Sequence, residues 1–119
     1  MKESILYEKS QELCHKGLDI VDILLSKNRF NFAKQLEKSV TSIAANISES
    51  EHAESKKDFI HKLRIASKEA RETELWFKLI DKRSIVSIDK ETIDLLNHIQ
   101  RMLSKSISTT IKNQKNKED

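Results

Sequence analysis

The chain has no proline, one glycine and one cysteine in 119 residues, and aromatic residues make up 5% of it. Proline and glycine form most tight turns between strands, so this composition excludes a sheet with several hairpins. Long helices tolerate the same composition well. The lone Cys14 cannot form an internal disulfide. We therefore expect an almost entirely helical protein.

Long apolar runs are also missing. No stretch approaches the ~18 to 20 uninterrupted apolar residues that a membrane span requires. The first residues, "MKESILYEKS", lack the apolar run of a signal peptide. Together with the unpaired cysteine, these absences predict a soluble, cytoplasmic protein with no membrane partner.

Motifs for catalysis and cofactor binding are absent as well: there is no glycine-rich phosphate loop, nucleophile elbow or zinc-ligand spacing. Two Glu-x-x-His sequences, Glu12 to His15 and Glu49 to His52, have the spacing of di-iron carboxylate bundles. On a helical wheel both pairs lie opposite the apolar stripe of their helix, whereas such metal ligands must point into the bundle. We predict a non-enzymatic protein without catalytic residues, cofactor or metal.

Amphipathic helical patterns are what the sequence does contain. The length of the chain suits one domain, residues 1–119, with a single core. Four segments carry apolar residues at helical spacing, and short connections between them predict an all-α, antiparallel up-down-up-down four-helix bundle. The helices are expected at about residues 4–27, 31–52, 56–82 and 89–113, with a frayed C-terminal tail.

Three local features refine this prediction. Gly17 lies beneath the apolar stripe of the first helix, where a missing side chain lets another helix approach closely. Ser55, with Asp58 three residues later, has the spacing of a capping box before the third helix. Ser87 or Asp89 is expected to cap the fourth helix.

Positive charge is concentrated in the second half of the chain. Residues 1–55 contain 7 Lys and Arg against 9 Asp and Glu, whereas residues 56–119 contain 15 against 10. A basic surface of this kind makes salt-sensitive contacts to phosphates, although a merely solvated helix face has the same appearance. Our candidates for nucleic-acid binding are Lys57, Arg64, Lys68, Arg101, Lys105 and Lys112.

The third helix also has apolar residues outside its core stripe. A large aromatic residue at the edge of a charged face suits an interface between subunits. The alternative is that these residues only widen the face toward the core. Our candidates for an oligomer interface are Ile65, Glu69, Glu72, Leu75, Trp76 and Leu79.

Residues 39–80, "SVTSIAANISESEHAESKKDFIHKLRIASKEARETELWFKLI", resemble the four-helix-bundle family that is also called the 23S rRNA intervening-sequence protein family. The accessory variability proteins of diversity-generating retroelements are related to it. Many members carry proline near the position of Ala44 and glycine at the position of Ser50. This chain has neither residue at these positions. The residues that carry the resemblance include Asn46, Glu49, Ser55, Asp58, Phe59 and Arg71.

The resemblance implies a bacterial, cytoplasmic four-helix bundle that assembles into a homopentamer. It also implies a link to RNA or DNA, and to a reverse transcriptase as partner. Within "KEARETELW", Lys68 and Glu72 have the i, i+4 spacing of an ion pair. We expect Glu72 and Trp76 to contribute mainly to assembly.

Two functions follow from this reading. The first is an accessory protein that presents a basic surface to nucleic acid or to a nucleoprotein such as a reverse transcriptase. The alternative is a scaffold that binds only protein and whose charge serves solubility. Steep salt-dependent retention on RNA or DNA is expected of the first alone.

Overall fold

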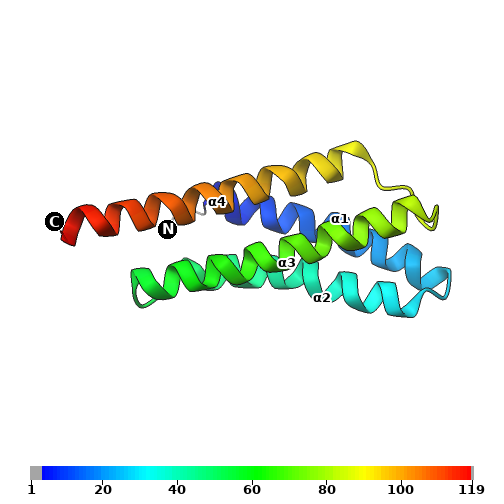
Figure 1. Cartoon of the computed structure of the whole chain (residues 1–119). Coiled ribbons are helices and arrows are strands. Elements are labelled where there is room, and N and C mark those ends of the chain that lie inside the picture. The colour runs from blue at the N-terminus through cyan, green and yellow to red at the C-terminus, as the bar shows by residue number, and fades with distance from the viewer. Residues whose placement is uncertain (1–3, 119) are drawn as a thin grey trace.

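The computed structural model describes residues 4–118, which form four helices joined by short connections (Figure 1). The helices are α1 (Ile5–Ser26), α2 (Phe30–Ser50), α3 (Lys56–Lys82) and α4 (Lys90–Glu118). The prediction of an all-α four-helix bundle is confirmed. The molecule is elongated, 56 × 23 × 22 Å. Within residues 4–118, no helix combines the length and the apolar character that a membrane span requires.

The helices form a ring in which each contacts two others: α1 packs on α2, α2 on α3, α3 on α4 and α4 on α1. Figure 1 shows that each helix reverses direction relative to the preceding one. α4 packs less extensively on its neighbours than α1, α2 and α3 pack on one another. The core consists of the predicted apolar stripes, and its fully buried large residues are Leu13, Leu24, Leu36, Val40, Ile43, Ile47, Leu63, Phe77, Ile80, Leu96, Ile99 and Leu103.

α1 and α2 pack closely at Gly17, as its position in the sequence predicted. A Cβ atom on Gly17 would lie 2.9 Å from Cγ2 of Val40, closer than packed carbon atoms tolerate. Val40 is fully buried and β-branched, so its side chain has little freedom to move aside. The chain's single glycine therefore serves helix packing rather than a turn.

A buried polar contact joins α2 to α3. The hydroxyl oxygens of Thr73 and Ser39 lie 2.8 Å apart, and the Thr73 hydroxyl also lies 2.9 Å from the carbonyl oxygen of Glu69. Both side chains are almost completely buried. Because each hydroxyl has partners, this pair crosses the core without the cost of an unsatisfied polar group.

Side-chain caps mark where three helices begin, and Ser4 caps α1 by accepting a hydrogen bond from the Tyr7 N–H at 3.0 Å. Ser55 caps α3 by accepting a hydrogen bond from the Asp58 N–H at 3.0 Å. Asp89, rather than Ser87, caps α4 by accepting a hydrogen bond from the Thr92 N–H at 2.8 Å. Hydrogen bonds from Thr92 lower the pKa of Asp89, so this cap is strongest above the ordinary pKa of an aspartate and weakens as pH falls through the lowered value.

Two connections contain left-handed residues that are not glycine. Asn28 has φ 60° and Ser84 has φ 56°. Each follows a helix and closes a Schellman motif, with Arg29 N–H donating to the Leu24 carbonyl at 2.9 Å and Ile85 N–H donating to the Ile80 carbonyl at 3.0 Å. The Lys27 ammonium group also donates to the Ile85 carbonyl, which links the two connections at one end of the bundle.

Two boundaries differ from those expected. α4 continues to Glu118, so the prediction that it ends near residue 113 in a frayed tail is wrong. Lysine, glutamine and glutamate are good helix formers, and nothing in "KNQKNKE" stops a helix. α2 runs unbroken to Ser50, which lies within the last helical turn and has no positive φ, so a glycine is not required at this position.

We predict that Gly17→Ala destabilises the fold, although alanine favours a helix by about 1 kcal/mol. Overpacking against Val40 costs about 1 to 3 kcal/mol and should prevail. Denaturant unfolding of Gly17→Ala, Val40→Ala and the double variant tests this. The double variant should lose less stability than the sum of the single losses, because alanine at residue 40 makes room for the new methyl group. Strict additivity would contradict the packing argument.

Candidate nucleic-acid interface

An open groove with a volume of about 650 Å³ runs between α3 and α4. It lies between two helices that pack less extensively on each other than α1 packs on α2 or α2 packs on α3. α3 contributes charged residues to its lining, and α4 contributes neutral polar residues and one isoleucine. The lining residues are Arg64, Ser67, Lys68, Arg71, Glu72, Leu75, Gln100, Ser104 and Ile107.

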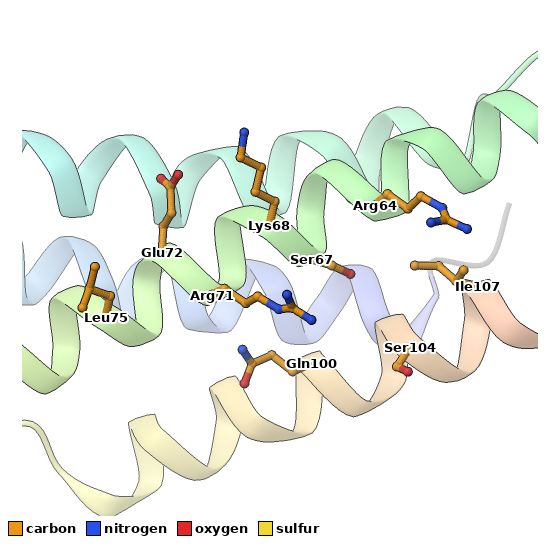
Figure 2. Close-up of a pocket in the computed structure, with 9 residues that line it drawn as sticks. All are labelled: Arg64, Ser67, Lys68, Arg71, Glu72, Leu75, Gln100, Ser104 and Ile107. Atoms are coloured by element: carbon orange, nitrogen blue, oxygen red, sulfur yellow. The ribbon is translucent and has the colours of Figure 1, made fainter.

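Figure 2 shows how these side chains are directed. Arg64 and Arg71 lie on the side of α3 that faces α4, and both side chains extend in the same direction along the groove. Gln100 and Ser104 face them from α4. Lys68 and Glu72 project from the opposite side of α3, so their charged ends lie away from α4.

The groove cations have no ion-pair partner among the described residues. The ion pairs found there join Lys9 to Glu12 (3.6 Å), Lys16 to Glu91 (3.5 Å), Lys62 to Glu49 (3.3 Å) and Lys78 to Glu74 (3.7 Å). The expected Lys68–Glu72 pair is not among them, so that prediction is wrong. Lys68 is exposed and Glu72 is half-buried, and both side chains point away from α4 in Figure 2.

The structure separates the predicted basic residues into two groups. Arg64 and Lys68 line the groove, and Lys57 is exposed two helical turns before Arg64. Arg101, Lys105 and Lys112 are exposed on α4, but none of them lines the groove. These three residues lie within about three turns of one another on the outer side of that helix.

Sequence reasoning missed Gln100 and Ser104 as site residues, and it assigned Arg71 to the basic face and the family motif without choosing it as a nucleic-acid-binding candidate. Gln100 and Ser104 are one turn apart, immediately after the core residues Ile99 and Leu103. Their spacing was therefore visible in the sequence. The face of α4 that turns toward α3 was not visible, because it depends on how the helices pack.

The predicted interface residues divide between two sides of α3. Trp76 is half-buried on the side toward α2, where its ring meets that of Phe32 edge-on with centroids 6.2 Å apart. Ile65, Glu69 and Glu72 are also half-buried. Leu75 and Leu79 remain 49% and 37% exposed. We call Ile65, Glu69, Glu72 and Trp76 the α3 flank.

Two polar atoms on the α3 flank lack hydrogen-bond partners among the described residues. They are Oε2 of Glu69 and Nε1 of Trp76, and both atoms are inaccessible to solvent. Burial raises the pKa of Glu69, and the neighbouring Glu72 carboxylate raises it further, while Lys38 and Lys68 act in the opposite direction. Unsatisfied buried groups of this kind need an explanation, such as a partner that is missing from the single chain.

The remaining motif residues stabilise the fold. The Asn46 amide donates to the Ser42 carbonyl at 2.9 Å, and Glu49 pairs with Lys62 across α2 and α3. Phe59 packs against the core and lines a smaller apolar pocket, of about 390 Å³, at one end of the bundle. Asp58 accepts a long, 3.4 Å hydrogen bond from the Glu54 N–H beside the Ser55 cap.

The residues considered for metal binding and for thiol chemistry lie apart from the groove. The side chains of Glu12, His15, Glu49 and His52 are exposed, as the helical wheel predicted. Within residues 4–118, no group of three or more His, Cys, Asp or Glu side chains is placed to hold a metal ion. Cys14 is half-buried, and burial raises the pKa of its thiol.

This chain is similar to a known protein family and to a solved structure. The family model for the 23S rRNA-intervening sequence protein matches residues 2–105. A crystal structure from Bacteroides thetaiotaomicron, described as a protein with unknown function from the S23 ribosomal protein family, is 35% identical with a TM-score of 0.79. The similarity covers 87% of this chain and 98% of that one. No curated protein matches the sequence.

We predict that Glu69→Gln stabilises the isolated chain by about 1 kcal/mol at pH 7, the low end for an unsatisfied buried group. A raised pKa means that the folded state binds the proton more tightly. The stability due to this proton is complete below the ordinary value of 4.5 and is lost as pH rises through the raised value. The difference in the free energy of unfolding between Glu69→Gln and wild type should therefore grow as pH rises from 4 to 7.5.

Denaturant unfolding over this pH range, under conditions where the chain is monomeric, measures the effect. Glu37→Gln, at an exposed position on α2, is the matched control and should leave the pH dependence unchanged. A constant difference between Glu69→Gln and wild type would contradict the assigned environment of Glu69.

Proposed function

Since this chain belongs to the 23S rRNA-intervening sequence protein family, we propose that it is a non-enzymatic, homo-oligomeric protein that binds nucleic acid through the α3–α4 groove. The observation that carries the proposal is the pair of arginines, Arg64 and Arg71, on one side of that groove without ion-pair partners among the described residues. The bacterial cytoplasm, implied by the resemblance, is the proposed location.

The chemistry of the groove suits phosphate. A guanidinium group offers several N–H donors in a fixed plane and binds phosphate oxygens in pairs. The arginines are seven residues apart, which corresponds to about 10 Å along the helix at ~1.5 Å per residue. Each can therefore bind a different phosphate of one chain. Such contacts are insensitive to base sequence and weaken as salt rises.

The proposed assembly uses a different side of α3. The α3 flank faces toward α2, whereas Arg64 and Arg71 face α4. A neighbouring subunit on the flank could supply a donor for Glu69 and an acceptor for Trp76, the two atoms that lack partners. Packing there would leave Arg64 and Arg71 accessible, while Glu72 belongs to the flank and also lines the groove. Repetition of the groove around a closed ring, with the pentamer as the proposed form, would multiply its positive field.

A scaffold that binds only protein is the second candidate. Leu75 and Leu79 favour it, because exposed leucines next to a charged groove can anchor a protein partner. A reverse transcriptase bound to its RNA would use both kinds of surface. The salt dependence of binding to naked RNA separates the two candidates, since only the first predicts it.

We predict that Arg64→Gln and Arg71→Gln each weaken binding to RNA at low salt. Loss of one phosphate contact should also reduce the slope of log affinity against log salt by about 0.7 for a single strand. Fluorescence anisotropy with a labelled oligonucleotide at several salt concentrations measures both quantities.

Arg29→Gln is the matched control, because Arg29 is exposed at the start of α2 and outside the groove. It removes the same charge and should change binding much less. Equal losses of RNA affinity in all three variants would show that binding depends only on the net charge of the protein. No binding by the wild-type protein at any salt concentration would favour the scaffold.

We also predict that Glu72→Ala and Trp76→Phe weaken self-association. Phenylalanine removes the indole N–H while retaining a ring against Phe32, so the monomer should keep its helix content. Light scattering coupled to size exclusion gives the mass in solution, and circular dichroism checks the helices. Wild-type mass for both variants, or a monomeric wild-type protein, would overturn the proposed interface.

A further inference from the structure

Resting on the proposed function, we infer that the α3–α4 groove selects single-stranded RNA over duplexes and over single-stranded DNA. Arg64 and Arg71 hold the phosphates, and Gln100 and Ser104 contact the ribose 2′-hydroxyl groups from the opposite wall. This selectivity comes from the size of the groove and from the different chemistry of its two walls.

Size excludes a duplex from the groove. Its volume, about 650 Å³, lies within the ~300 to 1,000 Å³ of small-molecule sites and accommodates one or two nucleotides. The bundle itself is only 23 × 22 Å across, comparable to the width of a double helix. A duplex can therefore touch the rim of the groove, whereas a single strand can enter it.

The two walls differ in their hydrogen-bonding groups, although the α3 wall also contains the Ser67 hydroxyl and the Glu72 carboxylate. The guanidinium groups of Arg64 and Arg71 only donate, which matches phosphate oxygens that only accept. The Gln100 amide and the Ser104 hydroxyl both donate and accept. A phosphate would leave their acceptor capacity unused.

The 2′-hydroxyl group also donates and accepts, and it is present on each nucleotide of RNA but absent from DNA. Gln100 and Ser104 are one helical turn apart and face the arginines across the groove (Figure 2). A strand lying along the groove with its phosphates against α3 would turn its sugars toward them. Leu75 and Ile107 add apolar surface to the groove, suited to the faces of bases.

The test compares one sequence as single-stranded RNA, single-stranded DNA and double-stranded RNA, by anisotropy at low and moderate salt. Wild-type protein should bind single-stranded RNA at least fivefold more tightly than either competitor, the effect of about one hydrogen bond. Gln100→Ala should weaken binding to single-stranded RNA about fivefold and leave binding to single-stranded DNA unchanged. Ser104→Ala should act in the same direction.

Gln11→Ala, in the middle of α1 and outside the groove, is the control and should change neither affinity. Equal binding of the three nucleic acids, or equal losses for RNA and DNA in Gln100→Ala, would overturn the inference while leaving the proposed function intact. Failure of all three to bind would overturn the proposed function, and the inference with it.

Discussion

The contact between Gly17 of α1 and the Val40 side chain of α2 leaves no room for a Cβ atom on residue 17, so the close packing of these two long helices depends on it. The Val40 side chain fills the space that a side chain on residue 17 would need. α3 then packs against α2 around the buried Ser39–Thr73 hydroxyl pair. The fourth helix packs less closely on this three-helix unit, and the space that remains beside it is the groove. The proposed site is thus a result of unequal packing among four similar helices.

α3 combines three roles on different sides of one helix. Its buried stripe, which includes Ala70 and Phe77, completes the core. Its side toward α4 carries Arg64 and Arg71, and its side toward α2 carries Glu69 and Trp76. The side toward α4 has charge without ion-pair partners in the described chain, and the side toward α2 has buried polar atoms without hydrogen bonds. The charges on the side toward α4 and the polar atoms on the side toward α2 can therefore form favourable contacts with other molecules.

The helices and the core were predictable, because the sequence repeats its apolar residues at helical spacing and contains capping residues such as Ser55. The role of Gly17 was also predictable, since a lone glycine on a buried stripe indicates close packing. The groove was not. Its position depends on how far α4 lies from α3, which helical periodicity does not encode. The C-terminal end of α4 and the absence of a Lys68–Glu72 ion pair were also not predictable. Both depend on how water competes with contacts inside the protein, which residue spacing does not describe.

The left-handed residues Asn28 and Ser84 lie in the two connections that the Lys27 side chain joins. The Schellman hydrogen bonds fix the ends of α1 and α3, and the Lys27 hydrogen bond joins the connections that follow them. A rotation of α4 about the Ser84 connection would be largest at the opposite end of the bundle. Such a rotation would widen the groove near Ile107 more than near Leu75, so that a bound strand of any length would meet a tapered opening rather than a channel of uniform width.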